Sequence, residues 1–457
     1  MNHYPRIASF KSAAALRAHG AALGIDLPCD DAVVAALDSP LAQPLAVDGA
    51  LLANRFAIQP MEGWDGTADG RPTDLTERRW RRFGASGAAL IWGGEAVAVR
   101  ADGRANPHQL LLTDATAGSI GALRRALVDA AAAGGGPPPL VGLQLTHSGR
   151  WARTAAGPAP RIAFRHPLLD GRVGVTDDTT VLEDADVEAL IGDFARAARL
   201  AQQEGFDFVD VKHCHGYLLH EFLAARSRPG RFGGRDLTAR TRLLFAILDA
   251  VRAAAPRLAI AVRLSVFDVV PYRPGADGVG VAETAPLPYD AAFGLDLDLD
   301  EPIALVRALR TRGVRLLNVT AASPYYAPHV QRPAAFPPSD GYQPPEDPLV
   351  GVARLLDAAR RLKAAVPDAV VVSSGWSYLQ DWLPHVAQAT VRAGWFDAVG
   401  LGRMALSYPD LPADTLAGRP LDRKRICRTF SDCTTAPRQG RVSGCYPLDP
   451  FYRARRS

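Results

Sequence analysis

Residues 184–212 read DADVEALIGDFARAARLAQQEGFDFVDVK and contain a helical pattern followed by a strand pattern. Apolar residues recur every three or four positions in the first part, which predicts an amphipathic helix over 184–204 with Asp184 as its N-cap. After a glycine turn, residues 208–212 form a short and mostly apolar run. Runs of this kind are typical of strands buried on both faces of a parallel sheet.

This strand pattern occurs eight times, with helical patterns between the strands. The expected strands are 56–60, 89–93, 140–145, 208–212, 259–264, 316–320, 370–374 and 398–402. The expected helices besides 184–204 are 76–85, 115–133, 238–254, 303–312, 348–365 and 379–392. Eight such units predict an α/β protein with a (β/α)8 TIM barrel. A doubly wound sheet is the main alternative, but Met61-Glu62-Gly63-Trp64 after the first strand is not the Gly-rich phosphate turn that it normally carries.

Three stretches do not fit the repeat. We expect residues 1–45 to be an N-terminal extension, 46–420 the barrel and 421–457 a tail that contains cysteines. Residues 268–299 follow the fifth strand and are rich in turn residues, so we expect a lid-like insertion there.

Composition and charge exclude several classes of protein. The 457 residues carry a formal net charge of only +4 without a dense basic block, so a nucleic-acid surface is not indicated. There is no apolar run of about 18 residues to span a membrane. The N-terminus lacks the apolar segment of a signal peptide, so we expect a cytoplasmic protein.

In a (β/α)8 barrel, functional residues collect where the strands end. Polar and glycine residues follow all eight expected strands. Gly375 and Gly402-Arg403 follow the seventh and eighth, where backbone N–H groups commonly hold a ligand phosphate and an arginine adds a bidentate charge. The alternative is that these glycines are ordinary turn residues.

A series of motifs across residues 46–415 resembles the Old Yellow Enzyme family of FMN-dependent ene-reductases. The matching segments, in family order, are Asn54-Arg55, Pro60-Met61, Asp69-Gly70, Pro72-Thr73, 144–150, Gly205-Phe206-Asp207, 215–219, Glu221-Phe222-Leu223, 231–234, Arg263-Leu264-Ser265, 400–403 and Pro409-Asp410-Leu411. Each motif alone is a weak signal, whereas the ordered set is specific. The resemblance implies an FMN-binding (β/α)8 barrel.

The resemblance also implies where FMN would bind. Residues expected at the flavin edge near N5 and O4 are Pro60, Met61, Glu62 and Ala96. Gln144 would bond the pyrimidine ring and Arg263 would face N1 and the C2 carbonyl. The phosphate would lie against Gly375, Gly402 and Arg403. Arg263 in a buried ion pair and Gln144 as a core amide remain alternatives.

The reaction implied is hydride transfer from NADH or NADPH, through flavin N5, to a carbonyl-conjugated alkene of a small molecule. Tyr217 would donate the proton, since a phenol with a pKa near 10 stays protonated at neutral pH, and His215 would bind the substrate carbonyl. Lys212 stands where the family usually has histidine. Its charge suits an anionic substrate, or it pairs with Glu62.

The tail resembles the iron–sulfur segment of larger family members. Cys427, Cys433 and Cys445 occupy three of the four cysteine positions, and Phe430 stands at the fourth. A [4Fe–4S] cluster normally takes four thiolates. We therefore expect a reduced remnant in place of a cluster or a three-thiolate zinc site.

Two other functions compete with the ene-reductase hypothesis. A metal-dependent hydrolase on the same barrel would use Lys212, His213, His215 and His220, although the other strand ends lack the usual ligands. A degenerate barrel that binds flavin without catalysis is the second, and Tyr217 with His215 argues against it. The sequence leaves open whether the protein forms a homo-oligomer.

Overall fold

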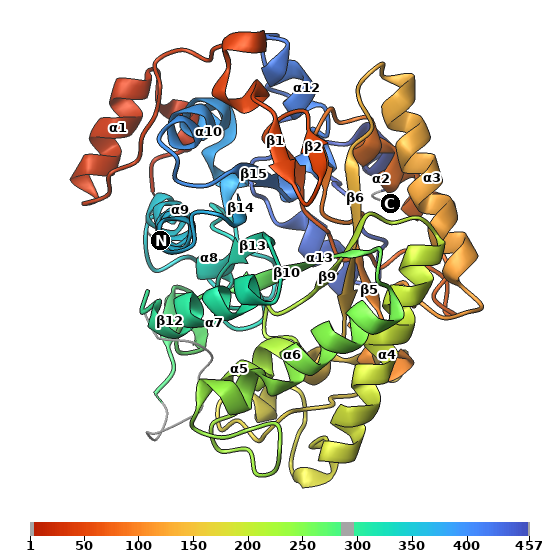
Figure 1. Ribbon diagram of the computed structural model, residues 1–457. Coiled ribbons are helices and arrows are strands. Elements are labelled where there is room, and N and C mark those ends of the chain that lie inside the picture. The colour runs from red at the N-terminus through yellow and green to blue at the C-terminus, as the bar shows by residue number, and fades with distance from the viewer. Residues whose placement is uncertain (1–3, 285–296, 456–457) are drawn as a thin grey trace.

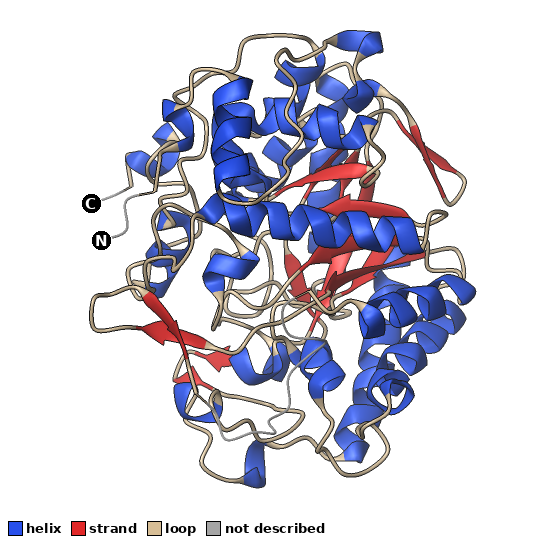
Figure 2. Ribbon diagram, turned by 90° about the vertical axis from the view of Figure 1, so that its left-hand side faces the viewer, coloured by secondary structure: helices blue, strands red, loops and turns tan. Residues whose placement is uncertain are grey.

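The protein is described by a computed structural model that covers residues 4–284 and 297–455. Eight parallel strands form the barrel: β3 (Phe56–Ile58), β4 (Leu90–Ile91), β6 (Leu140–Thr146), β9 (Phe208–Val211), β10 (Ala259–Ser265), β13 (Leu316–Thr320), β14 (Val370–Ser373) and β15 (Ala398–Leu401). The barrel closes because β15 pairs with β3 and β4 pairs with β6, and a further strand, β5 (Ala96–Ala98), adds to β6. Figure 2 shows these strands inside a layer of helices. The predicted (β/α)8 barrel is confirmed.

Helices connect successive strands on the outside (Figure 1). They are α2 (Asp74–Gly84), α3 (Ala117–Ala133), α4 (Asp184–Gln203), α6 (Leu237–Ala254), α7 (Asp300–Thr311), α9 (Pro348–Ala365) and α10 (Leu383–Arg392). Shorter helices, some of them on the loops of the barrel, are α5 (Leu218–Ala224), α8 (Pro328–Gln331), α11 (Arg403–Ser407) and α12 (Leu411–Leu416). Each long helix falls close to a predicted one.

Five of the seven long helices begin one to four residues from the predicted start, and two departures at helix starts have a clear physical cause. The N-cap of α4 is Glu183, because its carboxylate accepts the amide of Asp186 in a reciprocal capping box, and Asp184 is the first helical residue. The helix expected over 379–392 begins only at Leu383. Before it, Trp376–Trp382 forms 3-10 turns interrupted at Gln380, whose φ of 50° cannot continue a right-handed helix.

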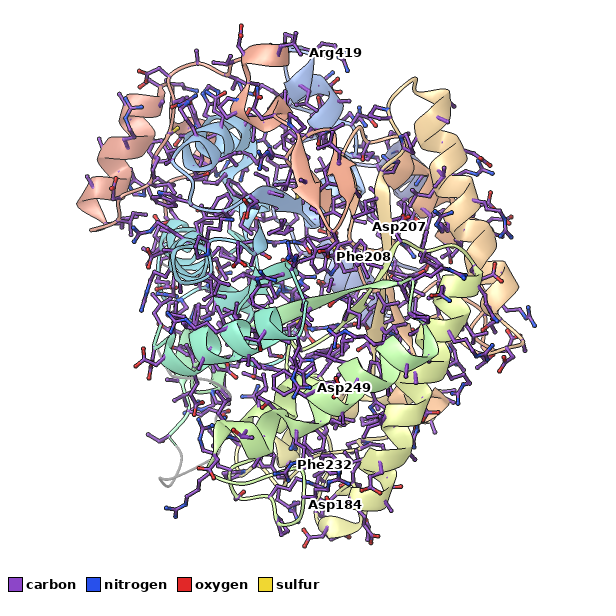
Figure 3. All side chains as sticks on the ribbon, in the orientation of Figure 1. Asp184, Asp207, Phe208, Phe232, Asp249 and Arg419 are labelled. Atoms are coloured by element: carbon purple, nitrogen blue, oxygen red, sulfur yellow. The ribbon has the colours of Figure 1, made fainter. Side chains whose placement is uncertain are left out.

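In the barrel interior, the large side chain of Phe208 packs against the small residue Gly142. Phe208 on β9 stands opposite Gly142 on β6, where a Cβ would lie 2.2 Å from the Phe208 ring. The same ring meets Trp92 edge to face at 5.4 Å (Figure 3 labels Phe208). Trp92 in turn donates a hydrogen bond of 2.7 Å to the buried Asp210. The glycine is therefore required for the close approach of β6 to β9.

The segments outside the repeat carry small elements. The N-terminal part contains α1 (Ala13–Ala22) and a hairpin of β1 (Leu45–Val47) and β2 (Ala50–Leu52). A short hairpin of β7 (Arg153–Thr154) and β8 (Gly157–Pro158) follows β6. In the expected insertion, β11 (Tyr272–Pro274) pairs with β12 (Gly280–Ala282), while residues 285–296 lie outside the described residues. The tail contains α13 (Asp432–Arg438) and α14 (Pro450–Arg453). Within the described ranges, no helix is both long and apolar enough to cross a membrane.

Candidate active site

A cavity lies at the carboxyl ends of the barrel strands. It is lined by eleven of the residues predicted from the sequence, namely Pro60, Met61, Glu62, Ala96, Gln144, Lys212, His215, Arg263, Gly375, Gly402 and Arg403. Tyr217 is buried at its edge, where its hydroxyl contacts Glu62 and Tyr325, two residues of the lining. The structure thus brings all the predicted cofactor and catalytic positions to one place.

Asp210 organises the floor of this cavity from within the barrel. Its carboxylate accepts hydrogen bonds from the Gln144 amide at 2.6 Å and from the Arg263 backbone N–H at 2.7 Å. Burial raises the pKa of Asp210, and these donors favour its charged form. Gln144 is therefore held in one orientation, in which its NH2 group donates to Asp210 and its carbonyl oxygen can accept a hydrogen bond from another group.

The Arg263 guanidinium is buried and lacks strong partners. Only 5% of the residue is exposed, and its Nε has no hydrogen-bond partner among the described residues. No ion pair of Arg263 occurs in those ranges, so the alternative of a buried ion pair is not what the structure shows. Burial lowers the pKa of Arg263, which marks the cost of keeping this charge away from water. Such a group fits an electron-rich acceptor in the cavity.

A second region of positive charge lies at the ends of β14 and β15. Arg403 donates from Nη2 to the Pro333 carbonyl at 2.7 Å, whereas its buried Nη1 has no partner in the described chain. Burial together with neighbouring Arg403 and Arg438 lowers the pKa of Arg332 to about 10. Gly375 has a φ of 98°, and a Cβ there would lie 2.8 Å from Leu355. Arg403, Arg332 and Arg438 line the same cavity as this glycine turn, and since only Arg438 pairs with a carboxylate among the described residues, the group fits an anion.

Tyr217 belongs to a compact group of polar side chains. Its hydroxyl donates to a carboxylate oxygen of Glu62 and lies 3.1 Å from the Tyr325 hydroxyl. The Lys212 ammonium lies 3.6 Å from the centre of the Tyr217 ring. Glu62 is therefore bonded to the phenol, and no ion pair joins it to Lys212 in the part of the chain that the structure describes. Burial and the Glu62 charge raise the pKa of Tyr217 well above its ordinary value.

His215 is presented to the cavity by an unusual backbone. Its φ is 67°, in the left-handed region, and its N–H donates to Ser265 at 3.1 Å while its carbonyl accepts from Ser323 at 2.7 Å. The ring Nε2 lies 3.1 Å from the Gln331 amide nitrogen. Burial and nearby cations lower the pKa of His215 well below its ordinary value, so the imidazole is neutral.

The other histidines do not assemble a metal site. His213 lies 3.3 Å from the Val211 carbonyl, and His220 Nδ1 accepts from the Gly216 N–H at 2.8 Å. Across residues 4–284 and 297–455, no group of three His, Cys, Asp or Glu side chains is placed to hold a metal ion. The arrangement required by the hydrolase alternative is therefore not found in these ranges.

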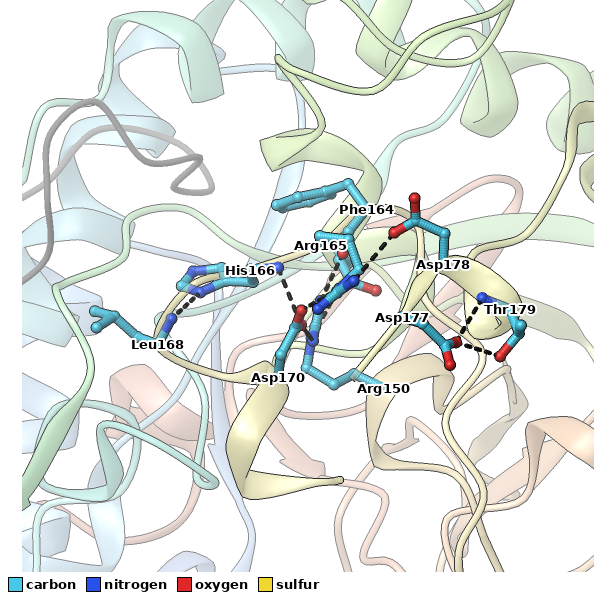
Figure 4. A network of polar contacts seen from close by, with 10 residues as sticks. Arg150, Phe164, Arg165, His166, Leu168, Asp170, Asp177, Asp178 and Thr179 are labelled. Atoms are coloured by element: carbon cyan, nitrogen blue, oxygen red, sulfur yellow. Dashed lines mark hydrogen bonds and ion pairs between the residues drawn. The ribbon is translucent and has the colours of Figure 1, made fainter. Parts of the chain in front are cut away.

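A buried polar network fixes the helix that carries Tyr217. Arg150, which is 1% exposed, donates from Nε to Glu221 at 2.7 Å and from Nη2 to the Phe164 carbonyl at 2.8 Å, and it also pairs with Asp170 (Figure 4). Tyr217 is the N-cap residue of α5, and the Glu221 N–H donates to its carbonyl at 2.9 Å. Arg150 and Glu221 therefore hold the first turn of α5 in place.

A sequence comparison identifies the family. The profile of the NADH:flavin oxidoreductase / NADH oxidase family matches residues 40–288. The chain belongs to this family. A flavin oxidoreductase from Gibberella zeae is 26% identical over 390 residues, which cover 80% of this chain and 83% of that protein. An NADPH dehydrogenase from Geobacillus thermodenitrificans is 27% identical over 390 residues, covering 82% of this chain and 93% of that protein.

Solved structures show the same fold. The Old Yellow Enzyme homologue from Zymomonas mobilis has a TM-score of 0.58 at 21% identity, over 85% of this chain and 96% of its own. A 2-naphthoyl-CoA reductase has a TM-score of 0.66 at 18% identity, over 90% of this chain but only 57% of its own. The resemblance to Old Yellow Enzymes is confirmed, and the protein is an NAD(P)H-dependent flavin oxidoreductase.

The residues of this flavin oxidoreductase fit FMN, the cofactor that its family implies with NADH or NADPH as reductant. The partnerless Nε of Arg263 is suited to the electron-rich pyrimidine edge of a flavin. The free Nη1 of Arg403 and the turn at Gly375 are suited to a phosphate. An anionic cofactor would also balance the positive charge of Arg332, Arg403 and Arg438 in the cavity lining.

Sequence reasoning missed the residues that cover the cavity. Helix α13 contributes Cys433, Thr434, Pro437 and Arg438 to the lining. The tail is tied down where Ser431 donates to the Phe336 carbonyl at 2.6 Å and Ser443 accepts the Trp64 N–H at 2.8 Å. Tyr325, Gln331 and Arg332 were also missed, although they lie on the loop after β13, where the barrel rule places functional residues.

The cysteines of the tail are thiols in distinct surroundings. Cys427 and Cys445 are buried, whereas Cys433 is partly exposed and lines the cavity. Burial raises the pKa of Cys445 to about 12. The tail segment therefore serves as a cover of the cavity, a role that its cysteine spacing did not indicate.

Proposed function

We propose that this flavin oxidoreductase reduces a carbonyl-conjugated alkene of a small molecule, with Tyr217 as the proton donor. The observation that carries the proposal is the position of the buried Tyr217 hydroxyl at the edge of the cavity that fits FMN, beside Lys212 and His215. Bound FMN supplies the hydride. The protein supplies the proton and binds the substrate carbonyl.

His215 and Lys212 polarise the substrate. His215 Nε2 accepts from the Gln331 amide, so the neutral imidazole holds its proton on Nδ1, and this N–H is the donor for the carbonyl oxygen. The Lys212 ammonium offsets the negative charge that develops there. Burial lowers the pKa of Lys212, so its charge is poorly solvated and interacts strongly with a nearby anion. The Lys212 ammonium beside Tyr217 favours a substrate that carries an acidic group.

The test is a visible spectrum followed by turnover. Purified protein should be yellow, release FMN on denaturation, and consume NADH or NADPH when an activated alkene such as 2-cyclohexenone is added anaerobically. Protein that takes up no FMN would contradict the proposal. An FMN-loaded protein that oxidises no NAD(P)H in response to any activated alkene would support the non-catalytic flavin binder.

Arg403→Ala is expected to weaken FMN binding by roughly 10–100-fold, because a hydrogen bond to a charged group contributes about 1.5–3 kcal/mol. Fluorescence titration of the apoprotein with FMN measures the change. Arg419→Ala is the matched control, since its side chain is 58% exposed and pairs with Asp414 at the surface (Figure 3). Equal FMN affinity in the two variants would argue against a phosphate beside Arg403.

A further inference from the structure

The hydrogen of the Tyr217 hydroxyl is donated to a protein partner, the Glu62 carboxylate. A phenol carries only this one proton. The Tyr325 hydroxyl, at 3.1 Å, occupies a second side of the same oxygen. Tyr217 is 1% exposed, so water does not replace these partners. Delivery of a proton to a substrate therefore requires a rearrangement within this group.

The charges around Tyr217 decide which rearrangement is favourable. If the phenol gave up its proton beside the Glu62 carboxylate, two adjacent anions would remain, one of them on the buried Tyr217. The Lys212 ammonium over the ring offsets one negative charge. A proton that binds to Glu62 before the reaction neutralises its carboxylate. The Tyr217 hydroxyl can then donate its own proton to the substrate while it accepts a hydrogen bond from the Glu62 carboxylic acid.

We propose that Glu62 is a proton relay that reloads Tyr217 during alkene reduction. This inference rests on the proposed function. In the step, the Tyr217 O–H bond breaks as a C–H bond forms at the substrate α-carbon, and the Glu62 O–H bond breaks as the Tyr217 O–H bond re-forms. When bound, FMN would supply the hydride for the β-carbon, with NADH or NADPH as the reductant. Glu62 is left as a carboxylate and regains its proton from water.

The position of Glu62 suits a relay. It lines the cavity, it is only half-buried, and its second carboxylate oxygen lies 3.4 Å from the Asn106 amide nitrogen. Glu62 thus connects the buried phenol to a space that water can enter. The charged and titratable groups that face this pair or line the same cavity are Lys212, His215, Arg263, Tyr325, Arg332, Arg403, Cys433 and Arg438.

The first test is the pH dependence of alkene reduction in the FMN-loaded enzyme. Reoxidation of the pre-reduced enzyme by 2-cyclohexenone should slow as pH rises, because the relay takes its proton from water. At low pH, the Glu62→Gln variant should react at least tenfold more slowly than the wild type, because an amide cannot release a proton. Its rate should not fall further as pH rises. The Glu62→Asp variant should still show a rate that falls as pH rises. A role of Glu62 in positioning alone would not explain this pH dependence.

The second test needs no turnover. Ultraviolet difference titration of the apoprotein follows tyrosine ionisation, and comparison with Tyr217→Phe identifies the signal of Tyr217. Glu62→Gln should move this ionisation to lower pH, since the Glu62 carboxylate raises the pKa of the phenol. An active enzyme whose Glu62→Gln variant keeps the wild-type pH profile would overturn the relay alone. An FMN-loaded enzyme that reduces no activated alkene would overturn the proposed function, and the relay with it.

Discussion

Replacement of Tyr217 by phenylalanine should slow alkene reduction by roughly 10²–10⁴-fold, the range that a positioned general acid contributes. The change removes one oxygen and leaves the ring, so the contact with Lys212 at 3.6 Å is kept. It also leaves Glu62 without the phenol whose hydroxyl donates to it. Single-turnover reoxidation of the reduced enzyme by 2-cyclohexenone measures the loss, because this reaction contains the proton transfer.

The matched control is Tyr452→Phe on α14, a buried tyrosine that does not line the cavity. This variant should reduce the alkene at the wild-type rate. A Tyr217→Phe enzyme that retains more than a tenth of the wild-type rate would show that another group, or water, delivers the proton.

Arg150→Ala should lower the free energy of unfolding by about 3–5 kcal/mol, the usual loss when one partner of a buried ion pair is removed. Glu221 and Asp170 would keep their charges in a site from which the balancing guanidinium is gone. Urea denaturation of the FMN-saturated protein measures the change. We also expect slower alkene reduction, because the turn of α5 that holds Tyr217 loses its support.

Arg315→Ala is the control for this loss. Its side chain is 57% exposed and lies 3.7 Å from Asp48, and an exposed pair of this kind contributes less than about 1 kcal/mol. Similar stability losses in both variants would mean that the network around Arg150 is solvated in the folded protein.

The barrel could be predicted because each of its strands is buried on both faces and is therefore mostly apolar. All eight expected strands are present, although β4 is only Leu90–Ile91. The errors lie at helix starts, where a single side chain decides the boundary. Glu183 competes with Asp184 for the same role, and the spacing of apolar residues does not distinguish them.

Of the candidate site, the sequence predicted the residues that directly follow the barrel strands. Glu62, Lys212 and Tyr217 were identified, but their mutual arrangement depends on side-chain packing between β3 and β9 loops that no local pattern encodes. The cover formed by α13 was missed for a related reason. Its contacts join residues about 95 positions apart in sequence, such as Ser431 and Phe336, and cysteine spacing carries no information about them.

Because α13 follows the barrel strands in the chain, the cavity acquires its cover only after those strands have been synthesised. The strands that would surround FMN are complete at Leu401, yet Thr434 and Arg438 leave the ribosome only after them. A nascent barrel can therefore meet the cofactor before the residues of α13 take their place in the lining. Proteolytic removal of α13 is therefore expected to speed the exchange of bound FMN, because four residues of the cavity lining would be lost.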